Sequence, residues 1–200
     1  MNDLQRKLLK ALIVGKPNVG KSTLLNFLVG DKVSIVSRKA QTTQKNTTGV
    51  ITKDSSQLVF FDTPGLNKMG KNIRISETFK TVAENVDLLI YMIDNRKKSQ
   101  SIDDQFSSWL TKNESSFRKK ILLVNKIDRI EKIKLFDITK KINAEFNFDE
   151  TFFISLTNKS GTESFVNWVN SQAYSNEWVF QESYKSNLGK KSFFLGDRKS

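Results

Sequence analysis

The stretch GKPNVGKST at residues 15–23 constrains the fold more than any other feature of the chain. It follows the apolar run ALIVG (11–15), which is typical of a buried strand, and it leads into KSTLLNFLVG (21–30), which is typical of a helix. Its glycines, lysine and serine fit the pattern G-x-x-x-x-G-K-[ST], whose backbone N–H groups surround phosphates at a helix N-terminus. The stretch therefore predicts a strand–loop–helix unit that binds a nucleotide.

The positions of this loop have distinct expected roles. Lys21 would reach the outer phosphates, and the Ser22 hydroxyl would hold Mg²⁺. The remaining residues expected to contact the nucleotide here are Gly15, Lys16, Pro17, Asn18, Val19, Gly20 and Thr23.

The chain contains neither cysteine nor histidine. This excludes disulfides, thiolate zinc sites and hydrolysis by a nucleophile–histidine pair. Carboxylates, hydroxyls, lysines, backbone amides and a hard cation such as Mg²⁺ remain, and phosphoryl transfer uses these groups.

Short β-branched runs alternate with longer amphipathic segments, which indicates an α/β fold with a mostly parallel sheet and helices on both faces. Six strands are expected, and one antiparallel hairpin joins two of them, GVITK and QLVFFD, through DSS. The expected strands are 11–15, 49–53, 57–62, 86–94, 119–128 and 150–155, and the expected helices are 21–30, 101–112, 133–146 and 161–172.

The tetrapeptide DTPG (62–65) follows the strand QLVFFD. Asp62 can hold Mg²⁺ through a water, opposite Ser22, and Gly65 lets a backbone N–H approach the γ-phosphate. On its own the tetrapeptide is an ordinary turn. Its place after a strand and downstream of the phosphate loop favours a sensor of the γ-phosphate.

The tetrapeptide NKID (125–128) selects the base. Asp128 can accept two hydrogen bonds from the N1–H and the amino group of guanine, and adenine offers neither in that arrangement. Lys126 can lay its aliphatic stem along the base, and Asn125 can tie the loops together. Three motifs in this order, each at the carboxyl end of a strand, predict that the nucleotide is GTP.

The motifs GKPNVGKS, DTPG and NKID, with SRKAQTT (37–43) between the first two, resemble the Era family of bacterial ribosome-assembly GTPases over about residues 9–169. The resemblance implies a P-loop GTPase fold. It also implies that Thr43 is the switch residue whose hydroxyl joins Mg²⁺ when GTP is bound, with Thr42 and Thr47 as the competing hydroxyls. The resemblance further implies that the last guanine-contacting loop begins at Ser155, with the amide of Leu156 reaching guanine O6.

The chain departs from the family pattern in three ways. Gln44 stands where the family usually has arginine, and the last loop reads Ser155-Leu156 instead of Ser-Ala. The family also continues into an RNA-binding KH domain with a Gly-x-x-Gly loop, and no such loop follows residue 172. We therefore expect an Era-type G domain at 1–172 and a tail, or a linker toward an absent KH domain, at 173–200.

Ras-type enzymes orient the attacking water with a glutamine shortly after DxxG, but here Leu66 follows Gly65. Era-like and related GTPases lack this glutamine, and some hold K⁺ through an asparagine of the phosphate loop. Asn18 takes that position, so K⁺ is an expected cofactor beside GTP or GDP and Mg²⁺. We expect slow, K⁺-stimulated hydrolysis. The expected catalytic residues are Asn18, Lys21, Thr43 and Gly65, and the expected Mg²⁺ ligands are Ser22, Thr43 and, through a water, Asp62.

The formal net charge of +12 favours polyanionic partners. The resemblance implies that the chain acts on the small ribosomal subunit or its 16S rRNA. We expect this binding to be weakened by the absence of the KH domain. The charge also leaves peripheral association with an acidic membrane surface open, such as the inner membrane. No apolar stretch is long enough to span a bilayer, which favours the cytoplasm. We also expect a monomer, because the sequence shows no long apolar surface stripe.

Two alternative functions remain open at this point. One is a nucleotide-binding module without useful turnover, acting as a scaffold or fragment. The other is a related ribosome-assembly or tRNA-modification GTPase, which would share Asn18 and the paired threonines; SRKAQTT argues against it.

Overall fold

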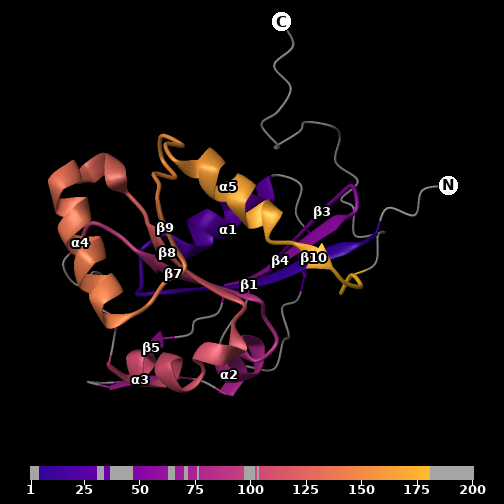
Figure 1. The fold of residues 1–200 in the computed structure, drawn as a ribbon, viewed down its shortest axis with the longest axis horizontal. Helices are drawn as coiled ribbons and strands as arrows, with labels where there is room; N and C mark the ends of the chain where they lie inside the picture. The colour runs from indigo at the N-terminus through magenta and orange to yellow at the C-terminus, as the bar shows by residue number, and fades with distance from the viewer. Residues whose placement is uncertain are drawn as a thin grey trace, which may run out of the picture.

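The centre of the molecule is a sheet to which eight strands of the described residues belong (Figure 1). The computed structural model describes residues 5–30, 34–36, 47–62, 66–69, 72–75, 77–96, 102 and 104–180. Seven strands follow the order β2-β3-β4-β1-β7-β8-β9, and β10 pairs with β1. Their bounds are β1 Lys7–Gly15, β2 Ser34–Val36, β3 Thr47–Lys53, β4 Ser56–Asp62, β7 Leu88–Ile93, β8 Lys119–Val124, β9 Glu150–Phe153 and β10 Tyr174–Ser175.

The sheet is mostly parallel, as predicted. β1 pairs in parallel with β4 and β7, and parallel pairing continues from β7 through β8 to β9. Antiparallel pairing occurs where β3 meets β2 and β4, and where β10 meets the start of β1. All six predicted strands are present. β2 and β10 were not predicted, because three and two residues are too few to carry a periodic pattern.

A second, two-stranded sheet lies apart from the main one and was also not predicted. Its strands, β5 Leu66–Met69 and β6 Asn72–Ile75, pair antiparallel. They fall in the segment that follows Gly65, where four-residue strands give little sequence signal.

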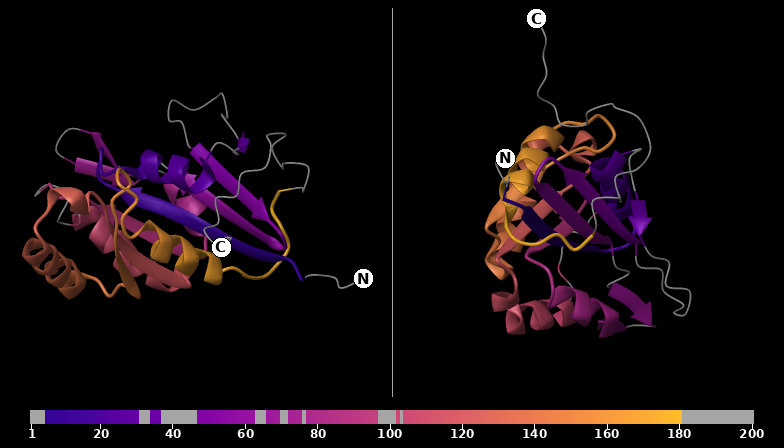
Figure 2. Two further views of the ribbon diagram at one scale, coloured as in Figure 1. Left: turned by 90° about the horizontal axis from the view of Figure 1, so that it is seen from above. Right: turned by 90° about the vertical axis from the view of Figure 1, so that its right-hand side faces the viewer.

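Helices cover both faces of the main sheet (Figures 1 and 2). α1 and α5 pack on one face, and residues of α2, α3 and α4 join the core on the other. The short helix α2 was not predicted, whereas the other four lie where the spacing of apolar residues predicts them. The bounds are α1 Lys21–Val29, α2 Glu77–Ala83, α3 Asp104–Lys112, α4 Lys132–Glu145 and α5 Thr162–Ser171.

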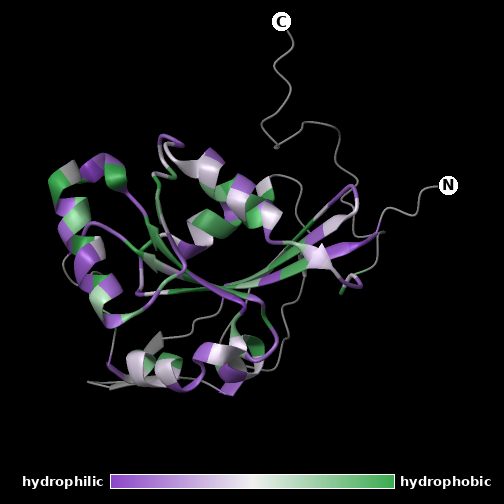
Figure 3. Cartoon of the chain, viewed as in Figure 1, coloured by the Kyte–Doolittle hydropathy of each residue, from purple (hydrophilic) through white to green (hydrophobic). Residues whose placement is uncertain are grey.

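The central strands are buried on both faces, so alternate residues of β1 enter two different cores. Leu12 and Val14 pack with α2 and α3, while Ala11 and Ile13 pack with α1 and α5. Several aromatic rings of the helices belong to these cores; Phe106 of α3, for example, stacks on Tyr91 of β7 with ring centroids 5.4 Å apart. Phe136 of α4 is an exception, because it is 69% exposed. Apolar residues accordingly dominate the strands in the interior (Figure 3).

The carboxyl ends of four parallel strands meet at one edge of the sheet. β1 ends at Gly15 and β4 at Asp62, while Asp94 and Asn125 directly follow β7 and β8. This is the edge at which open α/β sheets bind ligands. The strand order β4-β1-β7-β8 therefore brings the predicted phosphate, metal and base residues to the same edge.

The opposite end of β1 is covered by residues 174–180, which we call the C-terminal strap. Tyr174 pairs with Leu8, the Asn176 N–H donates to Arg6 O (3.1 Å), and Trp178 Nε1 donates to Lys7 O (3.1 Å). The strap begins just after the predicted boundary at residue 172. It fastens the chain to the end of the sheet away from the nucleotide edge (Figure 1).

Candidate nucleotide-binding site

The phosphate loop takes its shape from two glycines. Gly15 (φ 156°) passes so close to β7 that a Cβ would lie 2.2 Å from Met92 O. Gly20 (φ 111°) leaves no room either, because a Cβ would lie 2.5 Å from Asn125 Nδ2. Both backbones adopt values of φ that side chains disfavour, so the sequence pattern requires glycine at these positions. α1 begins directly afterwards, at Lys21.

Lys21 arches back over the loop. Its Nζ donates to Gly15 O (3.0 Å) and to Lys16 O (3.2 Å). Burial lowers the pKa of Lys21, and the nearby Asp62 carboxylate acts in the opposite direction. The ammonium group thus stands on the inside of the loop, where a phosphate would replace carbonyl oxygens as its acceptor.

Ser22 and Asp62 form the predicted metal pair. Ser22 Oγ donates to Asp62 Oδ2 over 2.8 Å, which joins the start of α1 to the end of β4. Burial raises the pKa of Asp62, while the Ser22 hydrogen bond and the charge of Lys21 act to lower it. Hard oxygen donors of this kind fit Mg²⁺, which usually binds one or two carboxylates together with phosphates and waters. No cluster of three or more acidic side chains gathers in the part of the chain that is described.

Asn125 ties three loops together. Its Nδ2 donates to Val19 O (2.9 Å) in the phosphate loop, and its Oδ1 accepts from the Leu156 N–H (3.3 Å) in the last loop. Asn125 is 3% exposed, and its hydrogen bond to Val19 O is shielded from water. The contact predicted from NKID is therefore present in the structure.

Asp128 stands in a short 3₁₀ turn, Ile127–Arg129, beside the last loop. Its Oδ1 accepts from the buried Ser155 Oγ over 2.6 Å. This hydrogen bond is the main cause of a lowered pKa of the Asp128 carboxyl, so the group is charged at neutral pH. A charged carboxylate held in this way can accept the two N–H groups of guanine.

Lys126 connects the base loop to the phosphate loop. Its Nζ donates to Asn18 O (2.8 Å) and forms an ion pair with Asp94 Oδ2 (2.7 Å). Lys126 and Asn18 both have a φ of 63°, in the left-handed region. Asp94 also binds Arg96, whose Nη2 donates to Pro17 O (2.8 Å). Asp94 and Arg96 were missed by the sequence analysis, although an aspartate directly after a buried parallel strand is a signal that could have found the first of them.

A cavity of about 380 Å³ opens between the phosphate, base and last loops. Eight of the ten residues that line it were predicted from the sequence, and two, Arg129 and Thr157, were not. Its lining consists of Asn18, Gly20, Lys21, Ser22, Thr23, Asn125, Lys126, Arg129, Leu156 and Thr157.

Two predicted catalytic residues, Thr43 and Gly65, lie outside the described residues, as does Thr42. The third competing hydroxyl belongs to Thr47, whose backbone is in β3 and pairs with Asp62. The roles assigned to these threonines therefore stay predictions.

Comparison with known proteins shows which family has this site. Residues 10–126 match the protein family described as 50S ribosome-binding GTPase, over more than half of the chain. The chain belongs to the 50S ribosome-binding GTPase family. The predicted P-loop GTPase fold is thus confirmed.

Curated proteins similar to this chain carry the name GTPase Era. The protein from Agrobacterium fabrum is 35% identical over 180 residues, which cover 88% of this chain and 55% of the relative. The protein from Clostridioides difficile is 40% identical over 161 residues, which cover 77% of this chain and 52% of the relative. The chain therefore spans about half the length of the curated relatives it matches.

Solved structures agree with this assignment. Era in complex with MgGDPNP and nucleotides 1506–1542 of 16S ribosomal RNA has a TM-score of 0.66 and 31% identity, and the match covers 92% of this chain and 63% of Era. Aquifex aeolicus Era bound to GDP and AlF4⁻ has a TM-score of 0.68 and 31% identity, with coverage of 92% and 62%. The resemblance to the Era family predicted from the motifs is confirmed over this region.

Proposed function

We propose that this chain binds GTP with Mg²⁺, hydrolyses it to GDP and phosphate, and works as a nucleotide-dependent switch. The observation that carries the proposal is the double hydrogen bonding of Asn125, which joins the phosphate loop to the loop beside Asp128. A single rigid unit thereby presents a phosphate cradle and a guanine-selective carboxylate on the same cavity.

The phosphate and metal residues each have a defined task in the proposed reaction. The loop amides and Lys21 bind the phosphates and neutralise the charge that develops as the γ-phosphoryl group leaves. Ser22 would hold Mg²⁺ directly and Asp62 would hold it through a water, and the ion would screen the phosphate charge. Thr43 and Gly65, in the motifs that precede and follow β4, would respond to the γ-phosphate.

Hydrolysis in this proposal depends on position and charge, since Leu66 stands after Gly65 where a water-orienting glutamine is absent. Asn18 lines the cavity, and its side chain is exposed there. We propose that this side chain helps to hold K⁺ beside the phosphates. A cation at that point would do the electrostatic work of an arginine finger.

The proposed partner is the small ribosomal subunit or its 16S rRNA. Two facts support it: the net charge of +12, and the fact that the related Era structure was solved with a segment of 16S ribosomal RNA. Peripheral binding to an acidic membrane, a cytoplasmic location and a monomeric state stay predictions. No helix among the described residues is long and apolar enough to cross a membrane.

Phosphate release from GTP is the first test of this function, measured with Mg²⁺ in K⁺ and in Na⁺ buffers. Turnover supports the switch. Tight binding of GDP and GTP without any phosphate release would instead support a binding module. Co-sedimentation with small ribosomal subunits, with a non-hydrolysable GTP analogue and with GDP, then tests the partner. Binding only with the analogue supports the ribosomal role, and binding in neither state contradicts it for this chain.

A further inference from the structure

Asp94 is a fully buried carboxylate at the nucleotide edge of the sheet. It directly follows β7, and its side chain is 0% exposed. Arg96 Nε donates to both of its oxygens, over 3.0 Å to Oδ1 and 2.8 Å to Oδ2, and Lys126 Nζ reaches Oδ2 over 2.7 Å. Burying a carboxylate is costly unless it is paired, and here two cations from separate loops meet it.

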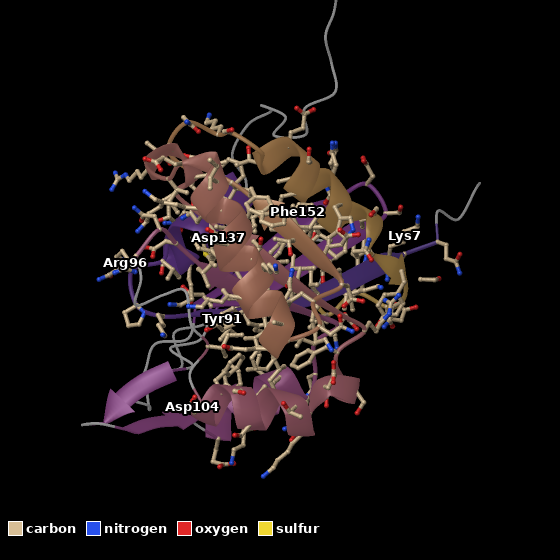
Figure 4. All side chains as sticks on the ribbon, turned by 60° about the vertical axis from the view of Figure 1, so that its left-hand side comes forward. Lys7, Tyr91, Arg96, Asp104, Asp137 and Phe152 are labelled. Carbon is tan, nitrogen blue, oxygen red and sulfur yellow. The ribbon has the colours of Figure 1, made fainter. Side chains whose placement is uncertain are left out.

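Both cations continue from Asp94 to the phosphate loop. Arg96 donates to Pro17 O and Lys126 donates to Asn18 O, each over 2.8 Å. Two consecutive backbone carbonyls of the loop are therefore held by side chains that Asp94 orients. Figure 4 shows Arg96 at the edge of the molecule opposite Lys7, which places this network at the far end of the sheet from the strap.

The held carbonyls fix the direction of the neighbouring amides. In a trans peptide unit the C=O and the following N–H point in opposite directions. Because Arg96 and Lys126 hold the carbonyls of Pro17 and Asn18, the N–H groups of Asn18 and Val19 are turned away from these cations. These amides belong to the stretch that the pattern assigns to phosphate binding.

The same network supports two residues in a costly backbone conformation. Asn18 and Lys126 each have a φ of 63°, in the left-handed region that residues with side chains adopt infrequently and that is costlier for lysine than for asparagine. One hydrogen bond, from Lys126 Nζ to Asn18 O, joins the two, and Asp94 anchors the donor. Without that anchor, both loops could relax to more common conformations.

We propose that Asp94 is a positioning residue of the nucleotide site, which shapes the phosphate loop and the base loop together before the nucleotide binds. Asp94 acts through Arg96 on Pro17 and through Lys126 on Asn18, and it does not need to touch the nucleotide itself. The inference rests on the proposed binding of guanine nucleotides.

The test compares Asp94→Asn with Asp87→Asn. Asp87 is a matched control because it is also buried (8% exposed) and stands next to the other end of β7, where it accepts from the Lys10 N–H (2.8 Å) and from Tyr174 Oη (2.9 Å). The dissociation constant for GDP and the Tm with and without GDP are measured for wild type and both variants. The KM and kcat for GTP are measured in parallel.

For Asp94→Asn we expect GDP binding to weaken by at least about tenfold, the effect of losing one charge-assisted hydrogen bond. The rise of Tm on adding GDP should shrink accordingly, and KM should rise more than kcat falls. Asp87→Asn should lower the Tm of the free protein but keep the wild-type affinity. Equal loss of affinity in both variants would show a general structural effect and overturn the proposal.

A second variant keeps the test decisive if Asp94→Asn fails to fold. Arg96 is 45% exposed, so Arg96→Gln removes the link from Asp94 to Pro17 O with little effect on the packing of the core. Its control is Arg118→Gln, since Arg118 stacks on Tyr174 (4.0 Å) at the other end of the sheet. We expect weaker GDP binding only in Arg96→Gln, and wild-type binding in both variants would overturn the proposal. Failure of the wild-type protein to bind GDP would instead refute the proposed function.

Discussion

Ser22 and Asp62 are 40 residues apart in the chain, yet Ser22 Oγ and Asp62 Oδ2 are joined by a 2.8 Å hydrogen bond. This contact closes α1 onto the end of β4. It also holds a buried carboxylate (9% exposed), whose burial raises its pKa above the ordinary value of 3.8. The predicted metal site is therefore a place where function and stability oppose each other.

The first prediction concerns how the contribution of Asp62 to folding stability depends on pH. A carboxyl whose pKa is raised on folding favours the folded state at low pH, and this contribution is lost as the pH rises through the raised pKa. The Asp62→Asn variant has no titrating group at this position, so it does not lose this stability as the pH rises. The Tm of the nucleotide-free variant, relative to wild type, should therefore increase between about pH 4 and pH 7, as measured by thermal unfolding.

The same variant should lose the effect of Mg²⁺ on nucleotide binding, because a neutral amide holds a Mg²⁺-bound water less well. The affinity for GDP with Mg²⁺ and with EDTA should differ in wild type and become similar in Asp62→Asn. A variant that loses stability at neutral pH and keeps the full Mg²⁺ effect would contradict both expectations.

The second prediction concerns the choice of base. Asp128→Asn replaces an acceptor-only group with an amide that cannot accept both guanine N–H groups, so GDP should bind at least about 100-fold more weakly. The amide can donate to the carbonyl that xanthine carries in place of the guanine amino group, so xanthosine diphosphate should gain affinity. Isothermal titration with both nucleotides measures the exchange. Asp149→Asn is the control, because Asp149 binds Lys119 and the Lys120 N–H away from the cavity; a loss of GDP affinity there would point to an indirect effect.

The third prediction concerns K⁺. Asn18→Gly keeps the left-handed backbone, which glycine adopts without strain, and removes only the side chain. Wild-type GTP turnover should be at least about tenfold faster in K⁺ than in Na⁺, and the variant should turn over GTP equally slowly in both. The GDP affinity of the variant serves as the control for an intact loop. Equal wild-type rates in the two salts would remove K⁺ from the mechanism.

The fourth prediction concerns Gln57, which is 0% exposed on β4 and binds the strap. Its Nε2 donates to Phe180 O (3.0 Å), and its Oε1 accepts from the N–H groups of Val179 and Phe180 (3.0 Å each). Gln57→Ala leaves these backbone groups without the amide, so unfolding in denaturant should show a loss of about 2–4 kcal/mol. GDP affinity should not change. Gln172→Ala, at the end of α5, should cost less than about 1 kcal/mol, and an equal cost in both variants would show that the strap contributes little.

The long, strongly patterned elements of this fold were predictable from the sequence. Runs such as ALIVG and ILLV are buried on both faces, and the helix spacing of Phe106 and Leu110 leads into one core, so pattern and environment agree. The phosphate and base motifs were predictable for a different reason: each is a set of neighbouring residues at the end of one strand, and local spacing is what a sequence displays.

The contacts that were missed join residues that are distant in the chain. Asp94 accepts a hydrogen bond from Lys126, and Gln57 donates one to a backbone carbonyl 123 residues away. On the sequence each is a single polar residue at the border of an apolar run, which has no periodic signature. Only the strand order brings the partners together, because β7 pairs with β8, and β4 and β10 both pair with β1.

The C-terminal strap also sets when this domain can finish folding during synthesis. Lys7 and Leu8 are made before the other strands of the sheet, but their antiparallel partners in β10 are made only after all of those strands. Until then the start of β1 keeps one row of backbone groups unpaired, and such an edge can pair with another chain. The strap is thus the last part of the sheet to pair, and the rate at which it docks governs how long the open edge of β1 can pair with another chain.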